Sequence, residues 1–197
     1  IPLLELIVKS GIPAAIDSLP KGIKGDKGAV AETIANNVRS KIMKEHLNDP
    51  AYYDRMSRLL EEIIADLRAK RIEYADYLRR IAELARQVQA GQADDIPDAL
   101  KKSPGLRAIF NNLGLEDRAL YPRTVPEPQV ASLGEGPRPE YQADGAKLKL
   151  ALAIDETVKR VRPDDWRGHQ PRENEIKRAL LPLLGNDVQE VERIFII

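Results

Sequence analysis

The spacing of apolar residues constrains this chain more than any other feature. Along residues 26–46 an apolar residue stands at every fourth position, namely at Val30, Ile34, Val38 and Ile42. This spacing places the side chains on one face of an amphipathic α-helix. Two further stretches, residues 50–67 and 74–88, repeat apolar residues at intervals of three and four. No convincing run alternates apolar and polar residues as a half-buried strand does, so the pattern predicts an all-α fold.

The ends of these helices are also marked in the sequence. Asn48 or Asp49 can cap a helix that has Pro50 in its first turn, and Gly91 can end the helix that follows. Only the short stretch AKRIE at residues 69–73 separates the two helices. We therefore expect them to pack as a long antiparallel hairpin, or to run nearly continuously if the junction is itself helical.

Shorter helices are expected on either side of the hairpin. Residues 3–19 indicate two helices broken at Gly11-Ile12-Pro13, and residues 103–114 indicate one more. Near the C-terminus, helical spacing returns through the apolar residues Leu148, Leu152, Ile154 and Val158. The predicted architecture is a multi-helix bundle with a long helical hairpin and a Pro-rich connecting loop.

Prolines and glycines gather between two helical parts, in residues 121–139. Such a composition favours a surface loop or linker. We therefore expect an N-terminal helical part over 1–114 that holds the hairpin, a loop or linker over 115–141, and a C-terminal helical part over 142–197. Apolar helical patterns run up to both ends, so the chain is expected to be truncated at each.

The charge balance limits the partners that this chain can attract. Its 31 Lys and Arg residues offset 31 Asp and Glu residues, and the net charge is zero. A DNA contact would therefore need a local basic patch. The chain has no cysteine, which excludes disulfides and thiolate chemistry. No apolar run approaches the ~20 residues of a membrane span, and we expect a cytoplasmic location without a membrane partner.

One set of residues has the letters of a metal-dependent nuclease site. Asp164, Glu175 and Lys177 follow the order of the PD-(D/E)xK pattern, in which two acids hold a divalent metal and a lysine orients water. That chemistry needs the acids on neighbouring strands. Here the apolar residues around Glu175 keep helical spacing, and residues two apart on a helix do not share a site. We predict no catalytic, cofactor-binding or metal-binding residue in this chain.

Other candidate sites carry less information. His46 and His169 lie far apart and fit no metal-ligand spacing. The stretch KGIKGDKG at 21–28 lacks the phosphate-loop pattern and predicts a flexible turn into a helix. Three lysines beside that helix start remain candidate contacts to the DNA backbone, namely Lys21, Lys24 and Lys27. Four tyrosines could stack on bases, but their helical spacing favours core packing: Tyr52, Tyr53, Tyr74 and Tyr77.

The only Trp of the chain lies in the motif DDWRG, at Asp164, Asp165, Trp166, Arg167 and Gly168. Either acid could cap the helix that follows, and the arginine could pair with an acid across the turn. The Trp ring could fill a junction of three helices, with its N–H donating to a carbonyl. Alternatively, Trp166 and Arg167 could anchor a partner, since these residue types dominate interface hot spots. Both hypotheses stay open.

Several stretches of the sequence together resemble one protein family. They are GDKGAVAETIANNVRSKI (25–42), AYYDRMSRLLEEII (51–64), YADYLRRIAELARQV (74–88), SPGLRAIFNNL (103–113) and AIDETVKRVRPDDWRGHQPRENEIKRAL (153–180). In this order they resemble the C-terminal helical region of the restriction (R) subunits of type I restriction-modification enzymes. The segment 115–141 matches less well, as a variable loop would.

The resemblance implies a function for the parent protein and a narrower one for this chain. The parent would be an ATP-dependent DNA translocase and endonuclease that uses ATP and Mg and joins methylation and specificity subunits. None of the family's nuclease or ATPase motifs is present here, so no catalytic residue is carried over. The chain would be a non-catalytic assembly domain that docks the motor subunit to the methyltransferase and specificity core. The alternative is a helical module that binds duplex DNA near the motor.

Overall fold

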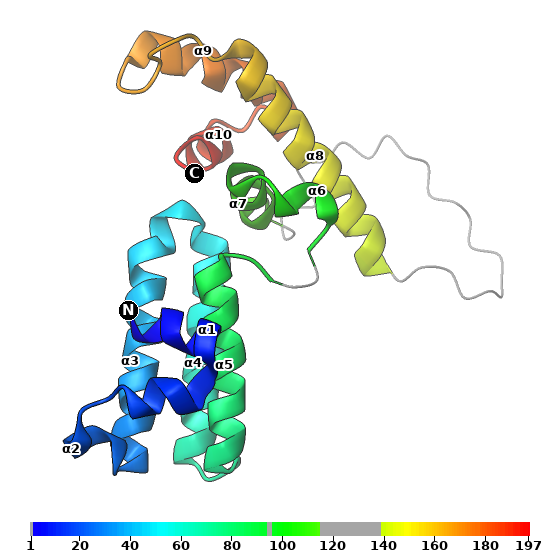
Figure 1. Ribbon diagram of the computed structural model, residues 1–197. Helices are drawn as coiled ribbons and strands as arrows, with labels where there is room; N and C mark the ends of the chain where they lie inside the picture. Colours follow the sequence, from blue (N-terminus) through cyan, green and yellow to red (C-terminus); the bar gives the residue numbers. More distant parts are fainter. Residues whose placement is uncertain (1, 94–95, 115–138) are drawn as a thin grey trace, which may run out of the picture. The chain divides into compact units, whose positions relative to one another are not determined.

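The computed structural model describes residues 2–93, 96–114 and 139–197, with side chains described from residue 145 onward in the last segment. Within these ranges every regular element is a helix and no residue lies in a strand, which confirms the predicted all-α class (Figure 1). Most of the loop predicted over 115–141 lies outside the described residues. Helix α8 already begins at Pro139, inside that range.

The helices divide into two compact units, Ile1–Pro104 and Gly105–Ile197. The first unit contains α1 (Leu3–Asp17), α2 (Lys21–Lys24), α3 (Lys27–Glu45), a 3-10 turn (His46–Asn48), α4 (Pro50–Arg68), α5 (Tyr74–Ala90) and α6 (Asp98–Lys101). The second contains nearly all of α7 (Pro104–Asn112), then α8 (Pro139–Val161), α9 (Gln170–Leu180), a 3-10 turn (Leu181–Leu184) and α10 (Val188–Phe195). Sequence analysis placed the α7 segment in the N-terminal part. In the structure Lys147 of α8 lies over the Phe110 ring of α7, at 4.6 Å from its centroid.

In the first unit α3, α4 and α5 pack against one another, and α1 packs on α3 and α5 (Figure 1). The Tyr52 hydroxyl at the start of α4 donates to the Gln87 carbonyl near the end of α5, at 2.8 Å. The two helices are therefore antiparallel. Residues 69–73 form a turn rather than a continuous helix, which confirms the predicted hairpin.

Local residues mark the ends of these helices, and the ends predicted at Asp49 and at Gly91 are confirmed. Asp26 caps α3 by accepting from the Gly28 N–H at 2.8 Å. Asp49 caps α4 by accepting from the Tyr52 N–H at 3.2 Å, with Pro50 in the first turn. Gly91 ends α5 in the left-handed conformation, where a side chain would cost free energy.

Helix α1 is bent at Gly11, as the sequence predicted. Gly11 has φ 83° and ψ 173°, a conformation that is essentially restricted to glycine. Pro13 follows it and lacks the N–H that would continue the helical bonding. The two halves of α1 are in this way able to take different directions across the bundle.

The core of the first unit follows the apolar stripes read from the sequence. The α3 stripe is buried throughout, as are Met56 and Leu60 of α4. Farther along α4, other residues of the apolar repeat over 50–67 are only partly buried, namely Ile63, Ile64 and Leu67. The periodicity identified the apolar face of α4 correctly, but the bundle does not cover the whole length of that face.

The second unit is built on packing of α8, α9, the 3-10 turn and α10. Its buried stripe on α8 runs through Ala151, Ile154 and Thr157. Leu152, which was predicted to point inward, is instead 40% exposed. Ile154 of the same predicted set is fully buried, so the apolar spacing was right for Ile154 and wrong for Leu152.

Candidate interaction surface

An open groove of about 750 Å³ lies along the first unit, between residues of α1, α4 and α5. Its apolar lining comes from Ile7 and Val8 of α1, Leu59 and Ile63 of α4, and Leu84 of α5. Val8 is 40% exposed and Leu59 is 37% exposed, which is uncommon for large apolar side chains beside a formed core. The groove is therefore an apolar surface that the described part of the chain leaves open to solvent.

The cause of the groove is the continuation of the apolar face of α4 beyond the region that other helices cover. Met56 and Leu60 are sealed in the core, but Leu59 and Ile63 lie at its edge. Helix α1 packs mainly on α5 and reaches the groove only with Ile7 and Val8. Contiguous exposed apolar surface of this kind marks interaction sites more often than isolated apolar residues do.

Charged side chains border the groove with different signs on its two walls. The α4 wall carries Glu62 and Asp66, whereas the α5 wall carries Glu83 and three arginines. The arginines are Arg79, Arg80 and Arg86.

Most of these charges form ion pairs within the unit. Asp66 accepts from Arg80 at 3.3 Å, Arg86 pairs with Glu83 at 2.6 Å, and Arg79 pairs with Asp76 at 2.7 Å. Among the described residues Glu62 has no ion pair. These pairs are exposed, and exposed pairs are easily exchanged for others.

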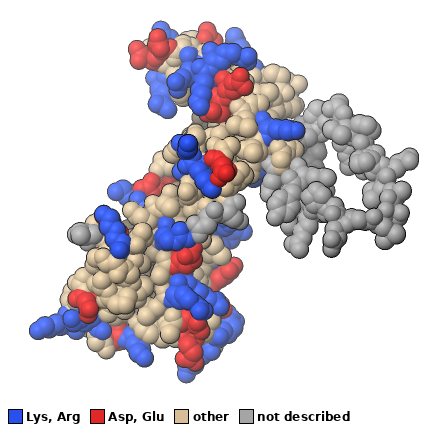
Figure 2. All heavy atoms as spheres, turned by 45° about the vertical axis from the view of Figure 1, so that its right-hand side comes forward, with Lys and Arg blue, Asp and Glu red and all other residues tan. Residues whose placement is uncertain are grey.

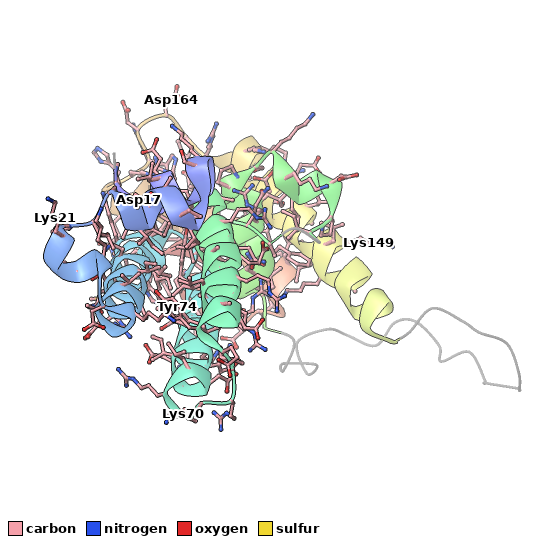
Figure 3. The ribbon with its side chains drawn as sticks, turned by 60° about the horizontal axis from the view of Figure 1, so that its bottom comes forward. Asp17, Lys21, Lys70, Tyr74, Lys149 and Asp164 are labelled. Atoms are coloured by element: carbon pink, nitrogen blue, oxygen red, sulfur yellow. The ribbon has the colours of Figure 1, made fainter. Side chains whose placement is uncertain are left out.

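The DDWRG motif forms the turn between α8 and α9. Trp166 is half-buried, with its ring edge-on to Phe195 of α10 at 5.5 Å between centroids. The Arg167 guanidinium lies 4.9 Å from the Trp166 ring centroid. Asp164 and Asp165 are exposed, and Asp164 points away from the helices in Figure 3.

The bonds that hold this turn differ from those predicted. The N-cap of α9 is His169, not Asp164 or Asp165. The turn is held instead by two residues of α9. Arg172 donates from Nη1 to the Asp164 carbonyl at 2.6 Å, and Glu173 accepts from the Gly168 N–H at 2.9 Å.

The remaining contacts predicted for the motif also differ. Arg167 stacks on Trp166 rather than pairing with an acid, and no bond from the Trp166 N–H to a carbonyl is present among the described residues. The Trp166 ring thus contacts Phe195 of α10 and the exposed Arg167 guanidinium. The motif thus has both a structural contact and an exposed part.

The nuclease-like residues do not converge. Glu175 and Lys177 both lie on α9, and Glu175 is exposed. Lys177 pairs with Glu192 of α10 at 2.7 Å and lies over the Phe195 ring at 4.7 Å. Throughout the described ranges no three His, Cys, Asp or Glu side chains are grouped so that they could hold a metal.

The two histidines belong to different units of the chain. His169 is exposed at the start of α9. His46 Nε2 lies 2.8 Å from Asp54 Oδ1, an isolated contact at the end of α3. Sequence reasoning did not find this pair, because the residues belong to different helices.

The three candidate DNA-contacting lysines are near one another along the chain but do not surround a free helix end. Lys21 and Lys24 belong to the four-residue α2, and Lys21 projects away from the bundle in Figure 3. Lys27 lies over the Tyr74 ring at 5.4 Å. The amides at the start of α3 are already bonded to the Asp26 carboxylate, whose charge would repel a phosphate.

The face drawn in Figure 2 does not extend this weak patch into a broad basic surface. Figure 2 shows Lys and Arg side chains interspersed with Asp and Glu side chains on the face that it draws. Such a mixed surface creates little long-range attraction for nucleic acid.

The tyrosines are core residues rather than a base-stacking platform. Tyr52, Tyr53 and Tyr77 are buried, and Tyr74 is half-buried with its ring stacked on Tyr77 at 6.3 Å. Burial raises the pKa of Tyr77 far above its usual value. Burial, and then the charge of Asp26, also raise the pKa of Tyr74. The prediction of core packing is confirmed for the three buried rings.

Comparison of the chain with protein-family models, curated proteins and solved structures gives no match. In the described part of the chain no helix is both long and apolar enough to span a bilayer.

Proposed function

We propose that this chain is the C-terminal helical assembly domain of a type I restriction enzyme R subunit. In this role it docks the motor subunit onto the methylation and specificity subunits in the cytoplasm and performs no catalysis itself. The parent protein would use ATP and Mg to translocate and cleave DNA. The link to restriction enzymes rests on the resemblance of the sequence stretches from 25–42 to 153–180.

The observation that carries the docking role is the groove between α1, α4 and α5. It exposes apolar side chains from three helices within one unit. Exposure of such an apolar surface to water is unfavourable, and binding of a partner that covers it lowers the free energy.

The alternative proposal is a DNA-binding module that uses Lys21, Lys24 and Lys27. The exposed position of Lys21 and Lys24 is compatible with backbone contacts. The capped start of α3 and the mixed charge of the surface make this proposal weaker than docking.

The two proposals are separated by capture of the purified chain on its cognate methylation–specificity complex, with and without duplex DNA. Docking predicts capture in the absence of DNA, with an affinity that falls less with salt than DNA binding does. DNA binding predicts no capture without DNA, and an affinity for bare duplex that falls steeply with salt. If neither the complex nor duplex DNA retains the chain, both proposals are wrong.

A further inference from the structure

We propose that the groove between α1, α4 and α5 holds an amphipathic helix of the partner complex. The apolar strip of that helix would be flanked by basic side chains on the edge facing α4 and by acidic side chains on the edge facing α5. The inference rests on the proposed function for the identity of the partner, and it assigns the docking site and the chemistry of its occupant.

The length of the groove fits a short helical segment. Its α4 wall runs from Leu59 to Asp66 and its α5 wall from Arg79 to Gln87. At ~1.5 Å of rise per residue, these walls are about 10–12 Å long, or roughly two helical turns. Two turns present apolar anchors at positions i, i+3 or i+4, and i+7, which is how helices bind in grooves.

The charges of the two walls determine which charged side chains are favoured along each edge of the bound helix. The α4 wall carries two acids, Glu62 and Asp66, and Glu62 has no ion pair among the described residues. The α5 wall carries three arginines against the single acid Glu83. Basic side chains beside α4 and acidic side chains beside α5 would therefore meet opposite charges along both edges. Because the edges differ, the charges also fix the direction in which the helix lies.

A second copy of this chain fits the groove less well. A two-fold contact places the same surface against itself, and two concave surfaces leave their apolar walls unfilled. Nucleic acid is also disfavoured, because Glu62 and Asp66 would face its phosphates. A convex apolar ridge with mixed charge remains, and an amphipathic helix has that form.

The test compares two charge substitutions in the groove with a matched substitution outside it. Leu59→Glu places a charge on the apolar floor, and Glu62→Lys reverses the unpaired charge of the α4 wall. Leu152→Glu is the control, since Leu152 on α8 has nearly the same exposure, 40% against 37% for Leu59. Affinity for the cognate methylation–specificity complex is measured by titration calorimetry with the whole chain. Thermal melts confirm that each variant is folded.

We expect Leu59→Glu to weaken binding at least tenfold, Glu62→Lys to weaken it severalfold, and Leu152→Glu to leave it within about twofold. Since Glu62 is exposed, its variant keeps the test decisive even if Leu59→Glu fails to fold. Wild-type affinity in folded Glu62→Lys and Leu59→Glu would overturn the groove proposal and leave the proposed function standing. Absence of binding by the wild-type chain would overturn both.

The nature of the occupant is tested by a photo-crosslinking amino acid at position 59, followed by mass spectrometry of the crosslinked peptides. We expect a peptide of the methylation or specificity subunit with apolar residues at helical spacing and with both Lys or Arg and Asp or Glu beside them. Crosslinks to a second copy of this chain, or to a segment without that spacing, would overturn the proposal.

Discussion

Replacing Tyr77 by Phe should change the stability of the first unit in opposite directions at neutral and at alkaline pH. Tyr77 is 1% exposed, and its hydroxyl donates to the Ala31 carbonyl of α3 at 2.6 Å. The variant keeps the ring and loses this hydrogen bond. Ala31 lies inside α3, so its carbonyl also accepts the bond of the helix itself. At neutral pH we therefore expect a loss of only ~1 kcal/mol in the free energy of unfolding.

At alkaline pH the same hydroxyl becomes unfavourable. Burial holds the pKa of Tyr77 far above its ordinary value of 10.0, so the folded chain keeps a proton that the unfolded chain releases. The stability contributed by this proton is complete below the unfolded pKa and is lost as pH rises above it. The loss is about 1.4 kcal/mol for each pH unit above ~10. Phe has no such proton, so the stabilities of the two proteins should become equal near pH ~11 and then reverse.

Urea unfolding followed by far-ultraviolet circular dichroism, at neutral pH and at several alkaline values, measures both effects. Tyr74, whose pKa is also raised, is present in both proteins and cancels from the difference. A difference that stays constant through the alkaline range would refute the reasoning, because it would mean that the Tyr77 hydroxyl is not withheld from water. A variant more stable than wild type at neutral pH would refute the estimate for the hydrogen bond.

Three further substitutions follow from local geometry. Asp49→Ala removes the cap of α4 and should cost about 1 kcal/mol of stability in chemical unfolding; an unchanged midpoint would contradict the capping role. Gly11→Ala should cost about 1–3 kcal/mol through its backbone conformation alone, since an added Cβ meets only Pro13 Cδ at 3.7 Å. Gly105→Ala, in a helix with open space around it, is its control and should be neutral or stabilising. Trp166→Ala should cost about 3 kcal/mol, at the lower end of the range for a fully buried ring, because its ring is partly buried against Phe195. If assembly weakens while its melting temperature is unchanged, Trp166 is a partner contact instead.

The long helices α3, α4 and α5 could be predicted from the sequence because their signals are local, whereas α2 was missed, since a flexible turn was predicted for Lys21–Lys24. A cap such as Asp26 or Asp49 acts on amides two or three residues away, and Gly91 ends α5 by its own conformation. The buried stripe of α3 is likewise set by spacing within one helix. These features depend on neighbours along the chain, which a single sequence contains.

The features that could not be predicted depend on contacts between helices. Leu152 has the spacing of a core residue, but the packing of the second unit leaves it exposed while Ala151 and Ile154 are buried. The turn at Asp164 is held by Arg172 of α9 rather than by its own acids. This bond depends on how α9 lies beside the turn, which the sequence alone does not show. The groove was missed for the same reason, since periodicity identifies an apolar face but not whether another helix covers it. Exposed Leu59 lies beside buried Leu60, and only the packing distinguishes them.

The Tyr52 hydroxyl bond has a consequence for the alignment of the groove walls. Helices with repeating apolar stripes can slide by one turn, about 5.4 Å, and still make similar contacts. The bond of 2.8 Å from Tyr52 to Gln87 does not survive such a slide, so it selects one alignment of α4 and α5. Gln87 itself lines the groove. The two walls are therefore already in register before a partner arrives, and a docking helix does not have to spend binding free energy on ordering them.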